Sequence, residues 1–404
     1  MKLKCPICLL AAACLLCGSA RAQESIPDEV LAAIRDDYRP MAELLAVKPG
    51  QVPTIGNRVR VIIDGEEKLG LLIADILSAR SSVNMEYFIF VNDEGSRLVR
   101  TALKLKALDS LDVRFILEDM RQAFTPSAYY DSMAEAGVQL CHYPFFPINT
   151  RNHQKVVTID GAVGYTGGMN IAGKYFYEWH DTDVRIEGPA VASLDAVFAE
   201  MWKHVHGRDY APPTPAAPFP DGIPVQIVAD GPSGNHYNLQ AYIWALNHAQ
   251  SYFYAKTPYF APPKELLDVL KNAAARGVDV RLVLPAPELM DEPVMVPVNA
   301  SCYRELLEAG IRLSFSEGRF DHGKIFACDD YLSAIGSVNM DGRSLLINHE
   351  DNAYFYDEGM ALQVKELILR SEREGEPITL DYVNSFTPGF RFLCALLRPF
   401  RLQF

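Results

Sequence analysis

The sequence contains two similar copies of one segment, so the chain must adopt a fold that can be built from two similar halves. In the first copy, an apolar run at 59–64 precedes a helical pattern and a second apolar run at 83–90. The second copy repeats this order with runs at 225–230 and 252–260. A further helix and apolar strand follow in each copy. This alternation predicts an α/β fold with a largely parallel or mixed sheet.

Each copy also carries the same set of polar residues after its strands and helices. The first set is His153, Lys155, Asp160, Gly167 and Asn170, and the second is His322, Lys324, Asp329, Gly336 and Asn339. The small residues Gly168 and Ser337 follow the two glycines. The spacing within the two sets is identical. A shared origin makes two copies similar everywhere, but it does not explain why these polar types recur where their neighbours have changed. We therefore interpret both sets as parts of a functional site.

The residue types in these sets suit phosphoryl chemistry. A histidine and a lysine two positions apart on a strand point to the same face. An imidazole can attack phosphorus covalently, and an ammonium group can hold a phosphate oxygen. The small residues at 167–168 and 336–337 would let the backbone approach a phosphate closely. The two asparagines can donate to phosphate oxygens or cap the helix that follows.

Four acidic residues, two of them outside the motif sets, bear on the site. Asp181 and Glu350 stand at the same distance after the histidine of their own copy. A carboxylate beside a histidine fixes its tautomer and raises its basicity, so we expect these two residues to orient the imidazoles. Asp160 and its counterpart Asp329 belong to the motif but lie at turns, where we expect structural ion pairs.

The doubled motif resembles the signature of the phospholipase D superfamily, in which His-x-Lys is followed by Asp and then by Gly-[Gly/Ser]-x-Asn. The surrounding segments are similar to those of bacterial cardiolipin synthases in particular. They lie at 152–173, 181–189, 257–260 and 336–344. The resemblance covers roughly residues 57–367, which is most of the chain.

The resemblance implies two tandem phospholipase D-like domains, each an α/β/α sandwich with a mixed sheet, related by a pseudo-twofold axis and sharing one active site. It implies His153 as a nucleophile that becomes a phosphohistidine, and His322 as the acid/base that protonates the leaving alcohol. Lys155 and Lys324 would bind phosphate, and no metal or other cofactor is required. The implied reaction transfers a phosphatidyl group between two phosphatidylglycerol molecules to give cardiolipin.

Three other functions stay open beside this one. The first is a phospholipase D-type hydrolase that releases phosphatidic acid, the second a secreted nuclease, and the third a membrane-binding protein with inactive motifs. The formal net charge of −13 argues against nucleic acid as a partner, because neutralising its phosphates requires clustered lysine and arginine.

Residues 1–22 have the pattern of a signal peptide. Lys2 and Lys4 precede an apolar run at 7–17, and Ala20 and Ala22 form a cleavage pattern. The apolar run is too short to span a bilayer. We therefore expect export to the periplasmic side of the membrane or secretion. Cardiolipin synthases typically begin with two membrane helices or with none, so this start is a departure from the resemblance.

The rest of the chain divides into five parts. They are a helical leader at 23–56 with one helix over 28–47, a first domain at 57–210, a proline-rich linker at 211–224, a second domain at 225–385 and a tail at 386–404. The tail mixes aromatic residues and leucines with arginines. Such a segment can lie on an anionic membrane or pack on the body as a terminal helix.

Four cysteines lie beyond the expected signal peptide, at Cys141, Cys302, Cys328 and Cys394. They are far apart in the sequence and form no Cys-x-x-Cys pair, so the pattern does not indicate a metal cluster. A disulfide can form after export, but scattered cysteines in a large domain are more often buried as small apolar residues.

Overall fold

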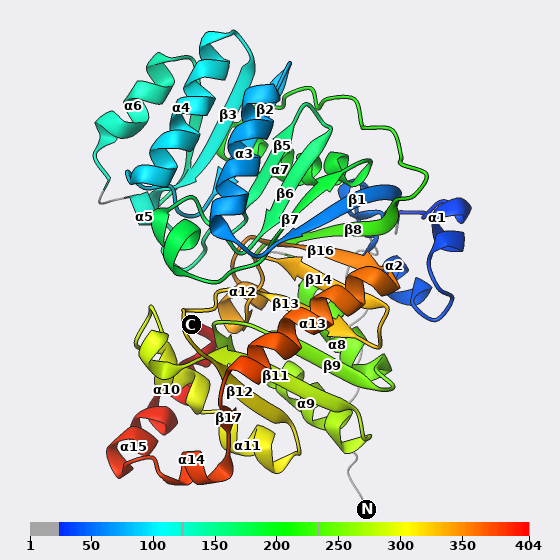
Figure 1. The fold of residues 1–404 in the computed structure, drawn as a ribbon, viewed down its shortest axis with the longest axis vertical. Coiled ribbons are helices and arrows are strands. Elements are labelled where there is room, and N and C mark those ends of the chain that lie inside the picture. The colour runs from blue at the N-terminus through cyan, green and yellow to red at the C-terminus, as the bar shows by residue number, and fades with distance from the viewer. Residues whose placement is uncertain (1–23, 123–124, 233, 404) are drawn as a thin grey trace, which may run out of the picture.

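The computed structural model describes residues 24–122, 125–232 and 234–403. The expected signal peptide at 1–22 lies outside the described residues. One mixed sheet of 15 strands runs through both halves of the molecule, in the order β17-β12-β11-β9-β13-β14-β16-β8-β1-β7-β6-β5-β2-β3-β4 (Figure 1). The first half lies above the second in Figure 1, and helices cover the sheet on both sides. The expected α/β class is confirmed.

The strands of the two halves follow the same order outward from the centre of the sheet. The first half contributes β1 (Thr54–Ile62), β2 (Ser82–Tyr87), β3 (Asp112–Glu118), β4 (Gln139–Tyr143), β5 (Val156–Ile159), β6 (Val163–Gly167) and β7 (Asp183–Glu187). The second half contributes β8 (Ile223–Asp230), β9 (Tyr252–Lys256), β11 (Asp279–Pro285), β12 (Arg312–Ser316), β13 (Ile325–Cys328), β14 (Leu332–Gly336), β16 (Glu350–Tyr356) and the edge strand β17 (Pro377–Ile378). Short strands β10 (Phe260–Ala261) and β15 (Met340–Asp341) pair in parallel beside this sheet.

The two halves join where β1 and β8 pair antiparallel. Asn57 holds this junction together, because its side-chain amide donates to the carbonyl of Ile223 at 3.1 Å and its oxygen accepts from the backbone of Ala190 at 2.7 Å. Since β1 begins at Thr54, the expected boundary between leader and first domain falls inside a strand. The junction makes one sheet of the two halves.

Helices complete each half in matching positions. The first half has α3 (Gly65–Ser78), α4 (Glu94–Leu108), α5 (Asp119–Gln122), α6 (Ser127–Glu135), a π-helical turn at Lys174–Glu178 and α7 (Ala190–His206). The second half has α8 (Tyr237–His248), α9 (Lys264–Ala275), α10 (Met295–Ala300), α11 (Tyr303–Glu308), α12 (Gly342–Leu346) and α13 (Glu358–Glu374). Side chains of α7 and α13 share one apolar core with the central strands of both halves.

The repeated aspartate at the end of the first strand of each half caps the helix that follows. Asp64 accepts a hydrogen bond from the backbone of Glu67 at 2.8 Å. Asp230 accepts from the backbone of Tyr237 at 2.9 Å and of Asn238 at 2.7 Å. A carboxylate here satisfies backbone donors that have no partner inside the helix.

The leader differs from its prediction as one helix over 28–47. It forms two short helices, α1 (Asp28–Ala33) and α2 (Arg39–Leu45), because the chain turns to extended geometry at Ile34. Pro40 then occupies the first turn of α2, where its missing N–H is tolerated. The apolar face of α2 is buried in the core of the second half.

Asp160 and Asp329 accept backbone hydrogen bonds where the sequence analysis expected ion pairs. Each lies at positive φ, 54° and 49°, in the turn between the two strands that follow its motif histidine. The Asp160 carboxylate accepts from the backbone N–H groups of residues 80–82, each at 2.8 Å. The Asp329 carboxylate accepts from those of residues 250–252, at 2.6–2.9 Å. The motif aspartates therefore fix the position of the backbone at the start of β2 and of β9.

The linker has little regular secondary structure, whereas the tail is mostly helical. Residues 207–222 form no helix or strand, and β8 begins inside the expected linker range. The tail contains α15 (Pro388–Leu397) and a 3₁₀ helix at Arg398–Gln403, after α14 (Leu380–Asn384).

The four cysteines are buried and unpaired, which agrees with their expected role as apolar residues. Within the described ranges, every helix is too short or too polar to cross a bilayer.

The carboxylates of Asp160 and Asp329 should stabilise the fold without taking part in chemistry. Replacing either residue with alanine leaves three backbone donors to water, and we expect a loss of about 1–2 kcal/mol in the free energy of unfolding. Urea unfolding measures this loss. Asp131→Ala, at an exposed position on α6, is the control, and an equal effect of all three changes would contradict the assignment.

Candidate active site

The segment that carries each motif histidine crosses to the opposite half of the molecule. The backbone N–H of His153 donates to the carbonyl of His349 at 2.9 Å, and that of His349 donates to Arg151 at 2.8 Å. The second half mirrors this bridge, with His322 donating to His180 at 2.7 Å and His180 to Phe320 at 2.9 Å. His180 and His349 thus act through their backbones to hold the two motifs together.

The two carboxylates at matched positions exchange partners between the halves. His153 Nδ1 lies 2.8 Å from Glu350 Oε2, and His322 Nδ1 lies 2.7 Å from Asp181 Oδ2. Glu350 begins β16 and Asp181 lies just before β7, so each acid comes from a strand start. A bond at Nδ1 directs Nε2 of each imidazole away from its carboxylate. Each histidine depends on the other half for its orientation.

The motif glycines make room for neighbouring carboxylate and amide side chains. A Cβ on Gly168 would lie 2.1 Å from Asp181 Oδ1, and one on Gly336 would lie 2.0 Å from Asn352 Oδ1. Ser337 has a different use, because its hydroxyl donates to Glu350 Oε2 at 2.5 Å. The expectation that the small residues also allow close approach of a phosphate stays a prediction.

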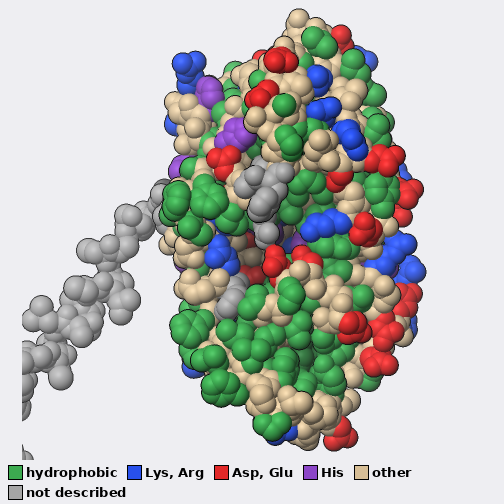
Figure 2. Space-filling model, turned by 90° about the vertical axis from the view of Figure 1, so that its left-hand side faces the viewer, with side chains coloured by type: hydrophobic (Ala, Val, Ile, Leu, Met, Phe, Trp, Pro, Cys, Tyr) green, Lys and Arg blue, Asp and Glu red, His purple; other side chains and the backbone are tan. Residues whose placement is uncertain are grey.

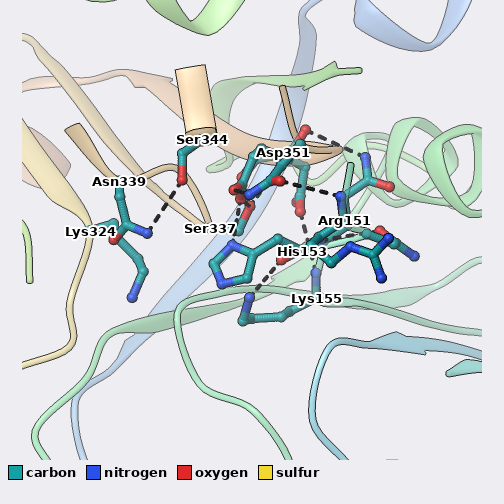
Figure 3. Close-up of polar contacts among 12 residues, drawn as sticks. Arg151, His153, Lys155, Lys324, Ser337, Asn339, Ser344 and Asp351 are labelled. Carbon is teal, nitrogen blue, oxygen red and sulfur yellow. Dashed lines mark hydrogen bonds and ion pairs between the residues drawn. The ribbon is translucent and has the colours of Figure 1, made fainter. Parts of the chain in front are cut away.

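Both motif lysines lie buried beside their histidines, as Figure 3 shows for Lys155. Lys155 Nζ donates to the His153 carbonyl at 2.6 Å, and Lys324 Nζ donates to the His322 carbonyl at 2.5 Å. Lys324 Nζ also lies 2.8 and 2.9 Å from the two ring nitrogens of His322. In Figure 3, Lys324 and Asn339 stand on one side of the His153 ring and Lys155 on the other.

Burial shifts the titration of the site toward neutral pH. It lowers the pKa of Lys155 to about 8 and that of Lys324 to about 7, because a charged ammonium loses its hydration. It raises the pKa of Asp181 and of Glu350 to about 7 for the same reason. The pKa of His322 is lowered by burial and then by the charge of Lys324. A phosphate anion would favour the charged form of both lysines.

The two motif asparagines hold neighbouring loops. Asn170 accepts through its side-chain oxygen from the backbone of Ile89 at 3.0 Å, which fixes the loop after β2. Asn339 donates to the hydroxyl of Ser344 at 3.3 Å. The cap of α12 is Asp341, which accepts from the backbone of Ser344 at 2.7 Å. The prediction that Asn339 caps the following helix, one of its two expected uses, is therefore wrong.

Buried polar residues that the sequence analysis missed form hydrogen bonds and an ion pair next to the motif residues. Asn152, just before His153, donates to Glu86 at 2.8 Å. At the matched positions of the second half, Asp321 forms an ion pair with Lys256 at 2.9 Å. Asp351 accepts from the hydroxyl of Thr166 across the halves. In the sequence, the charged residues Glu86 and Lys256 in two matched strands could have indicated these buried polar contacts.

Both histidines line one cavity of about 340 Å³. Its walls come from the loop after β2, the loop between β4 and β5, the residues before α10, the start of α12 and the tail. They include Phe88, Ile148, Tyr175, Tyr259, Val294 and Gln403. Figure 2 shows a hollow near the middle of this face, with charged side chains around it. Among the described residues, no group of three or more His, Cys, Asp or Glu side chains is placed to hold a metal ion.

This arrangement can carry out covalent transfer at phosphorus. Two oriented imidazoles face the same space, so one can attack phosphorus while the other handles the proton of the leaving or entering oxygen. Two buried ammonium groups can balance the charge of the phosphate oxygens. The carboxylates stabilise whichever imidazole becomes charged.

Comparison with known proteins supports this interpretation. Residues 72–202 and 242–370 match the family described as "Cardiolipin synthase, PLD-like domain", once in each half. Cardiolipin synthase from Listeria innocua serovar 6a is 34% identical over 357 residues, which cover 82% of this chain and 72% of that protein. The enzyme of the same name from Geobacillus thermodenitrificans is 32% identical over 374 residues, covering 87% and 73%.

A solved structure shows the same fold. Phosphatidylserine synthase from Haemophilus influenzae Rd KW20 superposes with a TM-score of 0.69 over 91% of this chain and 98% of that chain, at 14% identity. The family match in each half, together with this shared fold, confirms the expected pair of tandem phospholipase D-like domains.

Oxyanion binding at this site should weaken as the pH rises. Deprotonation of Lys324 near pH 7 and of Lys155 near pH 8 removes positive charge, so the affinity for tungstate should fall about tenfold per pH unit for each lysine that has titrated. Calorimetric titration from about pH 7 to about pH 9 measures this. In Lys324→Arg, which stays charged, the lower step should disappear. A constant affinity in the unmodified protein would contradict the assignment.

The exchanged carboxylates should each be needed for turnover. Asp181→Asn and Glu350→Gln keep the shape of the side chain but remove its charge, and we expect each to slow cleavage of bis(p-nitrophenyl) phosphate by about 10²–10⁴-fold. Glu308→Gln, at an exposed position on α11, is the control. Rates within twofold of the unmodified protein would show that the pairs do not orient the histidines.

Proposed function

Because this chain belongs to the cardiolipin synthase family of phospholipase D-like proteins, we propose that it transfers a phosphatidyl group from one phosphatidylglycerol to another. The products are cardiolipin and glycerol. The observation that carries this proposal is the placement of both oriented histidines, with both lysines, at one cavity.

In the first step, Nε2 of His153 attacks phosphorus in phosphatidylglycerol. The bond between phosphorus and the head-group glycerol oxygen breaks, and His322 gives a proton to that oxygen as glycerol leaves. For this step His322 starts as an imidazolium ion, which the anionic phosphate and Asp181 favour. The phosphatidyl group is then joined to His153 through a P–N bond. Lys155 and Lys324 hold the phosphate oxygens, while Glu350 stabilises the charge on the His153 ring.

In the second step, a primary hydroxyl of another phosphatidylglycerol attacks phosphorus. His322 takes the proton of that hydroxyl, and the P–N bond breaks. His153 and His322 return to their starting protonation, so one site serves both halves of the reaction. Asp181 holds His322 in one orientation in both steps, since the acid must later act as the base.

We also propose that the protein acts at a membrane surface on the exported side. The signal-peptide pattern of residues 1–22 supports export, and the apolar and basic residues of the tail at 386–404 support peripheral attachment. A phospholipid with two acyl chains resides in a bilayer, so an enzyme for it gains from contact with that surface.

The deciding experiment incubates the mature protein with phosphatidylglycerol vesicles and without added metal, and identifies the lipids by mass spectrometry. We expect cardiolipin from the unmodified protein and none from His153→Ala. His322→Ala should also fail to turn over, but protein denatured at alkaline pH, where the P–N bond survives, should retain phosphatidyl-histidine at position 153 when the substrate carries a good leaving group.

Three outcomes would change the assignment. Phosphatidic acid as the only product would make the protein a hydrolase. A covalent adduct on residue 322 in place of 153 would exchange the roles of the two histidines. Absence of any phospholipid turnover by the unmodified protein would overturn the proposed reaction.

A further inference from the structure

Exposed apolar side chains from three separate segments lie on the side of the molecule onto which the active-site cavity opens (Figure 2). The first half contributes Phe146 and Ile148, which are 69% and 53% exposed. The second half contributes Val294, and the tail contributes Phe392, Leu396 and Phe400. We call these six residues the apolar rim. Figure 2 shows hydrophobic side chains gathered below the hollow, on the side where α10, α15 and the C-terminal end lie in Figure 1.

The rim is continuous with the cavity. Ile148 and Val294 belong to the rim and also line the cavity, from opposite halves of the molecule. Gln403, at the end of the tail, lines the same cavity. A molecule that enters between the two halves therefore passes over apolar side chains before it reaches His153 and His322.

Packing on the second half holds the tail in this place. Cys394 is the buried residue of α15 and belongs to the core of the second half, and a Cβ on Gly342 would lie 2.6 Å from Cα of Leu402. Arg343 donates to the backbone carbonyl of Gln403 at 3.3 Å. The tail thus packs on the body, one of its two expected arrangements, and still presents Phe392 and Leu396 outward.

The outward face of α15 is apolar where a surface helix is normally polar. Phe392 and Leu396 are one helical turn apart, so they form a single exposed stripe. Large exposed apolar patches with polar neighbours mark surfaces that bind a partner or a membrane. The stripe therefore needs an occupant.

Charge indicates which occupant fits. The tail at 386–404 contains Arg391, Arg398 and Arg401 and no acidic residue, although the whole chain has a formal net charge of −13. All three arginines are at least partly exposed, although Arg398 pairs with Glu305 at 2.5 Å and Arg391 donates to the carbonyl of Asn384. Arginines beside inserted aromatic and leucine side chains complement the anionic head groups of a bilayer.

We infer that the apolar rim inserts into the surface of a phospholipid bilayer that contains anionic lipid. Both halves contact the bilayer, and the cavity between them opens onto the head-group layer. A lipid then enters with its phosphate leading while its acyl chains stay in the membrane. This inference rests on the proposed function for the identity of the entering lipid, but the binding surface is testable without turnover.

The test measures binding to sedimented vesicles of phosphatidylglycerol mixed with phosphatidylcholine, and of phosphatidylcholine alone. We expect tighter binding to the anionic vesicles. Phe392→Ser with Leu396→Ser should weaken binding about tenfold, and adding Phe146→Ser should weaken it about tenfold more. The matched control is Leu105→Ser with Leu108→Ser, two exposed leucines on α4 that are not part of the rim.

Activity on a dissolved substrate separates docking from chemistry. The rim variants at 146, 392 and 396 should turn over monomeric short-chain phosphatidylglycerol at the unmodified rate, because these residues do not line the cavity. If the unmodified protein binds vesicles through the rim but turns over no phospholipid, the proposed function fails while the docking surface stands.

Two results would overturn the docking surface. The first is vesicle binding by the rim variants that equals that of the unmodified protein and of the α4 control. The second is a change from dimer to monomer in the rim variants, seen by sedimentation velocity, with unchanged vesicle binding. That result would assign the rim to contact with a second copy of the chain.

Discussion

The hydrogen bond between each motif histidine and a carboxylate of the opposite half is the interaction on which the site depends. His153 is oriented by Glu350 and His322 by Asp181, so neither half contains both its motif histidine and the carboxylate that orients it. The backbone bridges at 152–153 and 321–322 keep these pairs in register. The antiparallel pairing of β1 with β8 and the shared core under α7 and α13 set the position of one half against the other. The geometry of the two histidine–carboxylate hydrogen bonds therefore depends on how the whole chain folds.

Burial gives these groups their chemical character. In water, the pKa of a lysine lies well above 7 and that of a carboxyl group well below it. Loss of hydration brings the pKa values of Lys324, Asp181 and Glu350 to about 7. Protons can then move among neighbours with little change in free energy, as a reaction that both donates and removes a proton requires. The small residues Gly168 and Gly336 contribute by letting acidic and amide side chains approach the motif backbone closely.

The two halves share a framework but differ in the polar groups that support it. Ser337 donates to Glu350, whereas the matched Gly168 has no side chain and leaves its space to Asp181. Behind the motifs, Asn152 is held by Glu86 in one half, and Asp321 is held by Lys256 in the other. These differences give the two imidazoles different surroundings, which suits one to act as nucleophile and the other as acid/base. The tail adds a further asymmetry, because it lies beside the cavity mouth on the second half alone.

The sequence by itself determined the α/β class, the duplication, the two motif sets and the presence of one carboxylate for each histidine. These features are local, because strand and helix periodicity and the spacing of polar residues follow from backbone geometry over short distances. Only the tertiary structure decided that Asp181 serves His322 and Glu350 serves His153, since counting along one copy cannot show an exchange between copies. It also decided that Asp160 and Asp329 bind backbone amides, and that the leader breaks into two helices on the second half. Such contacts join residues far apart in the chain, and they are fixed by how β1 meets β8 and by what the packed interior has room for.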